Sequence, residues 1–127
     1  MERVLLVMRD DGMRDALQHL WKGRYALTVC GCAEEARSLL GEKPDALVLD
    51  LFLPGEDGLT FLKKMASQKP PVVLVLTELF TEEISQDCIA LDVYALFMKP
   101  CTLDALSRNL KEGLESLQQK SEKSPLP

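Results

Sequence analysis

Residues 44–58 read PDALVLDLFLPGEDG, and this stretch decides the fold. Its apolar run, Ala46–Leu49, has the composition of a strand that is covered on both faces, and Asp50 follows it directly. Proline, glycine and acidic residues come next, which indicates a tight loop before a helix. The pattern therefore predicts a buried strand that places one carboxylate at its carboxyl end.

Similar apolar runs recur along the whole chain and alternate with amphipathic segments. The expected strands are Val4–Met8, Ala26–Cys30, Ala46–Leu49, Val72–Leu76 and Tyr94–Met98. Helical spacing is clearest in the last amphipathic segment, at Leu103, Leu106, Leu110, Leu114 and Leu117. Because strands and helices alternate throughout, we expect an α/β fold, a doubly wound (βα)5 arrangement in which helices cover both faces of a five-stranded parallel sheet.

The composition limits the classes of function. Apolar residues make up 46% of the sequence and charged residues 28%, and the net charge of −5 argues against direct nucleic-acid binding by this domain. No apolar stretch has the length of a membrane span, and the start, Met1-Glu2-Arg3, lacks the layout of a signal peptide. We therefore expect a cytoplasmic protein without membrane contact, whose four cysteines are reduced thiols.

The chain is expected to form one domain over residues 1–117, since 127 residues suffice for a single hydrophobic core. Residues 118–127 end in SEKSPLP, a composition typical of a C-terminal tail or the start of an interdomain linker.

In open α/β sheets the functional crevice lies outside the carboxyl ends of the strands. The residues that follow the expected strands are therefore the candidates for a site: Met8, Arg9, Asp10, Asp50, Thr77, Glu78 and Lys99. An exposed carboxylate such as Asp50 is a candidate nucleophile or metal ligand in this position.

Four pieces of sequence at these positions resemble the receiver domain of bacterial two-component response regulators. They are PDALVLD at 44–50, LPGEDG at 53–58, VLVLT at 73–77 and Lys99-Pro100, and the resemblance extends from Met1 to about Leu117. It implies the flavodoxin-like strand order 2-1-3-4-5. It also implies that Asp50 is the phosphoacceptor, which takes a phosphoryl group from a sensor histidine kinase or a phosphotransfer protein.

The resemblance assigns supporting roles to two further residues. Thr77 would hydrogen-bond the phosphoryl group and Lys99 would pair with it, and the peptide between Lys99 and Pro100 would be cis. These residue types suit the chemistry, because phosphoryl transfer needs mainly positioning and neutralisation of charge.

Four positions depart from the family pattern. Met8 and Arg9 stand where the family has two acids that hold Mg²⁺; a thioether is too soft for that ion and a guanidinium repels it. Glu78 adds bulk and negative charge after Thr77, and Leu96 replaces the switching aromatic residue. We therefore expect no cofactor, with Mg²⁺ binding weak at best, and hypothesise that Arg9 forms an ion pair with Asp50 or Glu78 in place of the metal.

Asp10 is a possible residual acidic ligand, if the loop shifts by one or two residues. The neighbouring Asp11, with Gly12, instead suits the start of the first helix, where acids are favoured, and we prefer that interpretation.

Other chemistry has little support in the sequence. Cys30 and Cys32 lack further cysteine or histidine neighbours for zinc, so the thiols are expected to pack as small apolar groups. An aspartate-nucleophile phosphatase of the haloacid dehalogenase type needs a second acid two residues after the nucleophile, where this chain has Phe52. We therefore do not expect an enzyme.

Two functions are left. The first is a phosphorylation-regulated receiver of a two-component phosphorelay with Asp50 as acceptor and an impaired Mg²⁺ site. The second is a phosphorylation-independent interaction module that controls a partner or a fused output domain. By resemblance, a homodimer would form through the face made by the fourth helix, the fifth strand and the fifth helix.

Overall fold

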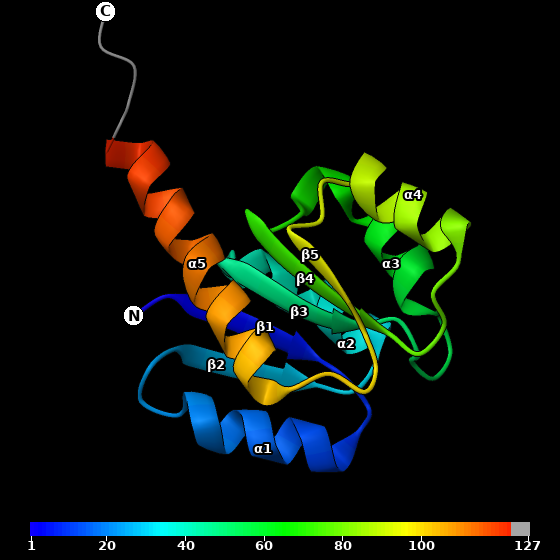
Figure 1. The fold of residues 1–127 in the computed structure, drawn as a ribbon, viewed down its shortest axis with the longest axis horizontal. Helices are drawn as coiled ribbons and strands as arrows, with labels where there is room; N and C mark the ends of the chain where they lie inside the picture. The colour runs from blue at the N-terminus through cyan, green and yellow to red at the C-terminus, as the bar shows by residue number, and fades with distance from the viewer. Residues whose placement is uncertain (123–127) are drawn as a thin grey trace, which may run out of the picture.

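The computed structural model describes the backbone of residues 1–122 and the side chains of residues 1–118. Five parallel strands form one sheet in the order β2-β1-β3-β4-β5, with helices on both faces (Figure 1). The predicted fold class and strand order are therefore confirmed. Within the described residues, no helix is both long enough and apolar enough to cross a membrane.

The strands follow the predicted ranges to within one residue at each end. The strands are β1 (Arg3–Val7), β2 (Ala26–Cys30), β3 (Ala46–Asp50), β4 (Val72–Thr77) and β5 (Ala95–Met98). The helices are α1 (Asp11–Trp21), α2 (Ala33–Leu39), α3 (Gly58–Lys64), α4 (Glu82–Ala90) and α5 (Leu103–Glu122). Short 3-10 turns at Leu40–Glu42 and Ala66–Gln68 follow α2 and α3.

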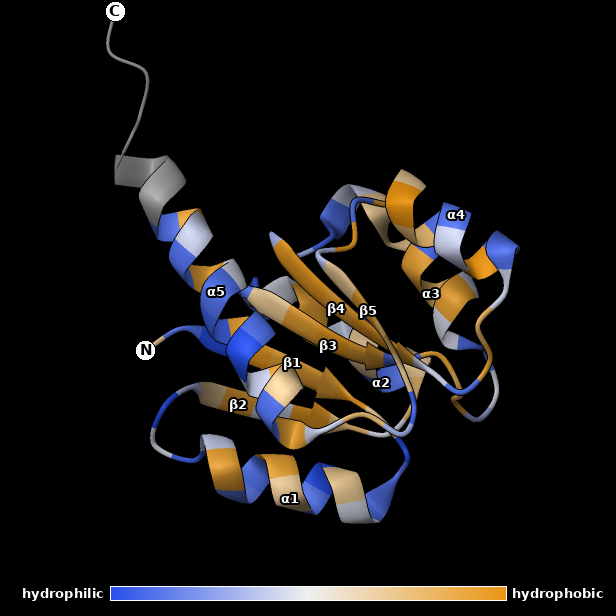
Figure 2. Cartoon of the chain, viewed as in Figure 1, coloured by the Kyte–Doolittle hydropathy of each residue, from blue (hydrophilic) through white to orange (hydrophobic). Residues whose placement is uncertain are grey.

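The central strands are buried on both faces, as their apolar composition predicted. Every residue of β3 and of β4 is buried, and these strands are hydrophobic along their length whereas α1 and α5 alternate in hydropathy (Figure 2). Side chains of successive strand residues point to opposite faces, so the sheet has two separate cores.

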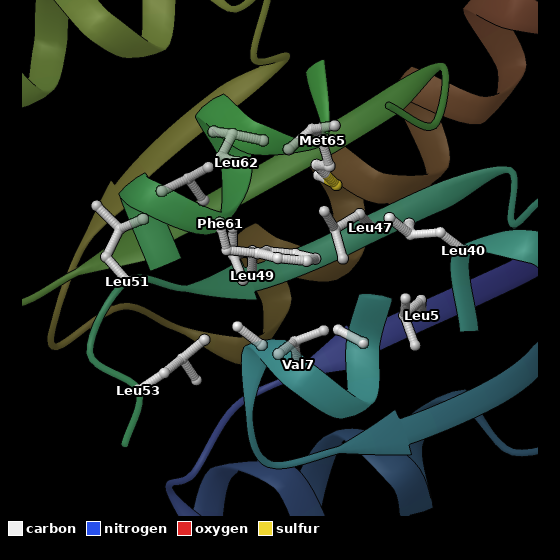
Figure 3. Close-up of a cluster of buried hydrophobic side chains, with 14 of the residues drawn as sticks. Leu5, Val7, Leu40, Leu47, Leu49, Leu51, Leu53, Phe61, Leu62 and Met65 are labelled. Atoms are coloured by element: carbon white, nitrogen blue, oxygen red, sulfur yellow. The ribbon is translucent and has the colours of Figure 1, made fainter. Parts of the chain in front are cut away.

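The first core lies between the sheet and helices α2, α3 and α4. Phe61 of α3 is fully buried here and packs among leucines of β1 and β3, including Leu5, Leu47 and Leu49 (Figure 3). The second core lies between the other face and helices α1 and α5, where the buried Trp21 donates its indole N–H to the Ser107 hydroxyl at 2.8 Å. Complete burial of each such large side chain stabilises the fold by about 1.5–3 kcal/mol.

Polar side chains fix the starts of helices next to the carboxyl edge of the sheet, among them those of α1, α3 and α4. Asp10 accepts a hydrogen bond from the Met13 amide at 3.1 Å, Asp57 from the Thr60 amide at 3.0 Å, and Thr81 from the Ile84 amide at 3.1 Å. A side-chain acceptor at this position satisfies an amide that has no partner within the helix, which contributes about 1 kcal/mol. These caps determine where the three loops around the site end.

The end of the chain differs from the sequence-based expectation. Helix α5 continues to Glu122, so the boundary that we placed between residues 117 and 118 falls within this helix. The apolar pattern of α5 ends at Leu117, but the polar residues after it are mostly good helix formers and prolong the helix. The remaining part of the predicted tail, residues 123–127, lies outside the described residues.

Candidate functional site

Asp50 is the last residue of the central strand β3, and it is only 1% exposed. One carboxylate oxygen, Oδ1, accepts a hydrogen bond from the Phe52 amide at 3.0 Å, and the other, Oδ2, is ion-paired with the Lys99 ammonium. The carboxylate is at the tip of a buried strand, as the sequence predicted, but it is not exposed as we expected, because both of its oxygens are held by partners inside the edge of the sheet.

Lys99 follows β5 and reaches across the end of β4 to Asp50. Its side chain is 13% exposed, and its backbone amide donates to the Thr77 carbonyl at 2.8 Å, which fastens the end of β5 to the end of β4. The peptide between Lys99 and Pro100 is cis, as the family resemblance implied. Because Asp50 is so deeply buried, its negative charge needs a cation nearby.

Thr77 ends β4 beside Asp50, and its side chain is buried. The hydroxyl donates to the Leu79 carbonyl at 2.9 Å and accepts from the Leu79 amide at 3.2 Å. It is therefore engaged with its own loop. To orient a group bound to Asp50, the hydroxyl would have to leave Leu79.

Met8 and Arg9, at the two altered positions after β1, point in opposite directions. Met8 is completely buried in the second core, and its amide donates to the Cys30 carbonyl at 3.1 Å. Arg9 is exposed to solvent. The hypothesis that Arg9 pairs with Asp50 or Glu78 is wrong: the cation paired with Asp50 is Lys99, and among the residues with described side chains no ion pair joins Arg9 to Glu78. The physical reason is that Met8 continues the alternation of β1 and points, like Val4 and Leu6, into the second core, so Arg9 comes after it in the exposed loop, where its guanidinium keeps its hydration.

The nearby acids do not converge on Asp50. Asp10 caps α1, which confirms the helix-start interpretation, with the cap one residue earlier than expected. Glu78 is exposed, and it lines an open cavity of about 610 Å³ together with Asp10, Lys99 and Cys101. Among the residues with described side chains, no three of His, Cys, Asp and Glu come together in a group that could hold a metal ion.

Leu96 is half-buried on β5, where it packs against the first core. The cysteines pack as expected: Cys30 and Cys88 are buried, and Cys32 and Cys101 are partly buried. Burial raises the pKa of the Cys30 thiol to about 11.

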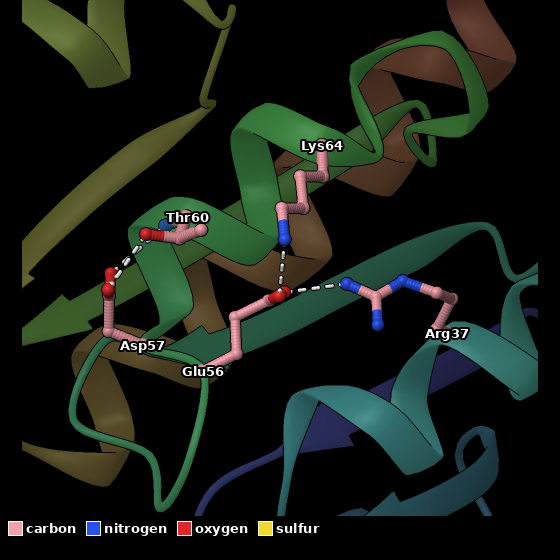
Figure 4. Close-up of polar contacts among 5 residues, drawn as sticks. All are labelled: Arg37, Glu56, Asp57, Thr60 and Lys64. Carbon is pink, nitrogen blue, oxygen red and sulfur yellow. Dashed lines mark hydrogen bonds and ion pairs between the residues drawn. The ribbon is translucent and has the colours of Figure 1, made fainter.

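The loop after Asp50 is held by a small network that the sequence analysis missed (Figure 4). Glu56 accepts from Lys64 of α3 at 2.9 Å and from Arg37 of α2 at 2.6 Å, and these cations lower the pKa of its carboxyl. Asp57 accepts from the amide and the hydroxyl of Thr60, which lowers its pKa too. The loop that follows Asp50 is therefore bonded to both α2 and α3.

Gly58 is a second feature of the site that was not predicted from the sequence. A Cβ added to it would lie 2.7 Å from the Asp50 carbonyl oxygen and 2.7 Å from the Leu51 Cα. Only glycine lets α3 approach the end of β3 this closely. The sequence around Gly58 predicted a turn, but it did not predict the close contact with the end of β3.

Comparison with known proteins identifies the family. The model of the response regulator receiver domain matches residues 4–111. The hydrogenase transcriptional regulatory protein HoxA of Cupriavidus necator is 29% identical over 89% of this chain. A protein-glutamate methylesterase/protein-glutamine glutaminase of Bradyrhizobium diazoefficiens is 38% identical over 64% of it. The matches span only 24% and 23% of those two proteins, so the chain covers about a quarter of the length of each relative.

Solved structures agree on the fold. The signal receiver domain of a putative Luxo repressor protein from Vibrio parahaemolyticus superimposes with a TM-score of 0.86 at 20% identity, covering 98% of both chains. A CheY-like receiver domain protein from Methanospirillum hungatei also gives 0.86, at 21% identity, covering 94% of this chain and 98% of the other. The strand order, the edge residues and the family match together show that this chain belongs to the response regulator receiver domain family of two-component signalling.

Proposed function

We propose that Asp50 accepts a phosphoryl group from a sensor histidine kinase or a phosphotransfer protein in the cytoplasm, without help from Mg²⁺. The observation that supports this most strongly is the buried pair of Asp50 and Lys99 at the end of β3. An Asp50 carboxylate oxygen would form the new bond to phosphorus while the bond from phosphorus to the donor breaks. The Lys99 ammonium stands where the added negative charge would develop.

The residues around Asp50 do not suit Mg²⁺. This ion takes hard oxygen ligands in octahedral geometry, and the two positions after β1 supply a thioether inside the core and an exposed guanidinium. Asp10, the possible residual ligand, is engaged as a helix cap. We therefore propose that Lys99 is the main source of positive charge for the phosphoryl group and derive no step through a metal.

Thr77 sets a second requirement in this proposal. Its hydroxyl would orient the phosphoryl group only after both of its hydrogen bonds to Leu79 are broken. Two neutral hydrogen bonds of this kind contribute about 1–3 kcal/mol together, so the exchange is favourable only if the new bond to a charged group compensates.

Intact mass spectrometry after incubation with acetyl phosphate tests the proposal. The expected result is a mass increase of one phosphoryl group in the wild-type chain and none in Asp50→Asn. The adduct should form to a similar extent, within about threefold, in MgCl₂ and in EDTA, because the metal contributes little to transition-state charge here.

Three other outcomes have clear meanings. An adduct in both the wild-type chain and Asp50→Asn would place the phosphoryl group elsewhere, and no adduct in either would contradict the phosphoacceptor role. An adduct that forms only with MgCl₂ would keep Asp50 as acceptor and contradict the proposed independence from metal.

A constitutive interaction module is the second candidate function, and exposed apolar side chains favour it. Ile89 of α4 is 76% exposed, Met98 of β5 is 53% exposed and Tyr94, just before β5, is 42% exposed. They belong to the α4–β5–α5 face, through which we propose that two copies of the chain associate. Large exposed apolar residues that gather in one region commonly mark interfaces.

Ile89→Glu is expected to weaken this homodimer by at least about tenfold, because a charge would be buried in the interface. Sedimentation velocity over a range of protein concentrations measures the change. Leu20→Glu is the matched control, since Leu20 is exposed on α1 and away from this face. A wild-type chain that is monomeric at every concentration would contradict the proposed dimer.

A further inference from the structure

Large apolar side chains are also exposed on two loops at the carboxyl edge of the sheet. Phe52 lies between β3 and α3, and Leu79 and Phe80 lie between β4 and α4; they are 65%, 65% and 54% exposed. The neighbours of Phe52 in sequence, Leu51 and Leu53, are both buried in the first core. Phe52 is therefore not needed for the core, and its ring is available to contact another molecule.

These loops enclose a groove of about 220 Å³. Phe52 and Leu79 stand on its two sides, and apolar residues Leu51, Leu59 and Ile84 line it further. Thr77 also lines it, so the groove opens directly beside the proposed phosphorylation site. A groove of this size and lining suits one or two apolar side chains of a binding partner.

The surroundings of the groove are acidic. Asp57 and Glu78 line it, and Glu82 and Glu83 are exposed in the first turn of α4. The two loop segments, DLFLPGED at 50–57 and TELFTEE at 77–83, contain no lysine or arginine. An apolar groove with an acidic rim is complementary to an apolar residue that is flanked by positive charges.

We propose that this groove binds a basic amphipathic helix of a partner protein, which inserts an apolar side chain between Phe52 and Leu79. Helices commonly dock in this way, with apolar anchors on one face and charged residues beside them. The docking itself does not require that Asp50 accept a phosphoryl group.

The groove is linked to Thr77 through Leu79. The Leu79 side chain lines the groove, while its backbone amide and carbonyl hold the Thr77 hydroxyl. A helix packed on Leu79 would stabilise this arrangement, in which the hydroxyl is turned away from Asp50. Such coupling is reciprocal, so binding of the helix opposes a hydrogen bond from the Thr77 hydroxyl to a phosphoryl group, and that hydrogen bond opposes binding of the helix. This last step rests on the function proposed above.

A synthetic helical peptide with leucines on one face and lysines on the other, labelled with fluorescein, serves as the probe. Fluorescence anisotropy with the unphosphorylated full chain measures its affinity. We expect binding that weakens as salt is raised and weakens by about tenfold or more in Phe52→Ser/Leu79→Ser. Glu78→Gln should weaken it by about threefold, through loss of one rim charge. A peptide with glutamate at every lysine position should not bind.

Two further variants distinguish docking in this groove from binding elsewhere on the chain. Leu20→Ser removes an exposed apolar side chain from α1, away from the groove, and should leave the affinity unchanged. Thr77→Val removes both hydrogen bonds to Leu79 and should weaken binding by about threefold. The chain is unphosphorylated in this experiment, so the outcome does not depend on whether Asp50 ever accepts a phosphoryl group.

The proposal is overturned if the wild-type chain does not bind the basic peptide or binds the acidic one equally well. It is also overturned if Phe52→Ser/Leu79→Ser has no effect, if Leu20→Ser has as large an effect, or if these loop residues prove to bury a second copy of the chain. Equal affinity in Thr77→Val would overturn the link between the groove and Thr77.

Discussion

Replacing Lys99 with methionine is expected to lower the free energy of unfolding by about 3 kcal/mol. Methionine preserves most of the packing volume but leaves the Asp50 carboxylate, 2% exposed at its side chain, without a cation. The one hydrogen bond from the Phe52 amide cannot compensate for a charge that is removed from water. Denaturation with urea at neutral pH, followed by circular dichroism, measures the loss.

The double variant Asp50→Asn/Lys99→Met identifies the cause of this loss. Because asparagine carries no charge, the double variant should recover most of the stability, and a double-mutant cycle yields the interaction energy. Lys64→Met is the matched control: Lys64 is 61% exposed and pairs with Glu56, which keeps Arg37, so its loss should cost less than about 1 kcal/mol. A Lys99→Met chain as stable as the wild type would mean that the pair does not stabilise the fold.

The sequence predicted the site to the extent that strand topology determines it. Asp50, Thr77 and Lys99 each follow an apolar run, and the carboxyl ends of parallel strands meet at one edge of the sheet. Their convergence therefore needed only the correct strands and strand order. The cis peptide before Pro100 came from the family resemblance instead, because no periodicity in the sequence determines a peptide isomer.

Side-chain direction outside the strands was harder to predict. The charge of Arg9 suggested a partner in Asp50, but Met8 still follows the alternation of β1 into the second core, and Arg9 is exposed in the loop after it. Spacing in the sequence says nothing about how a loop backbone turns once its strand has ended. The exposure of Phe52 has the same origin, since the burial of Leu51 and Leu53 follows from a loop conformation that composition does not determine.

Gly58→Ala is expected to destabilise the domain by about 3 kcal/mol, because the added methyl group has nowhere to go. Its Cβ would lie 2.7 Å from two atoms of the backbone, which cannot rotate away as a side chain can. To relieve the contact, the start of α3 must move away from β3, and the loop that contains Phe52 and Asp57 moves with it. We therefore expect a lower midpoint of urea denaturation and, in the acetyl phosphate experiment, slower formation of the adduct.

Gly41→Ala shows whether the loss comes from this contact or from replacing any glycine. Gly41 lies in an exposed 3-10 turn with nothing within 4 Å of an added Cβ, and its φ is not positive, so alanine there should be neutral or stabilise by up to about 1 kcal/mol. If both variants were equally stable, α3 would be free to shift at little cost. Asp50 would then be held by Lys99, the Phe52 amide and the sheet, and the close approach of α3 would have no part in positioning it.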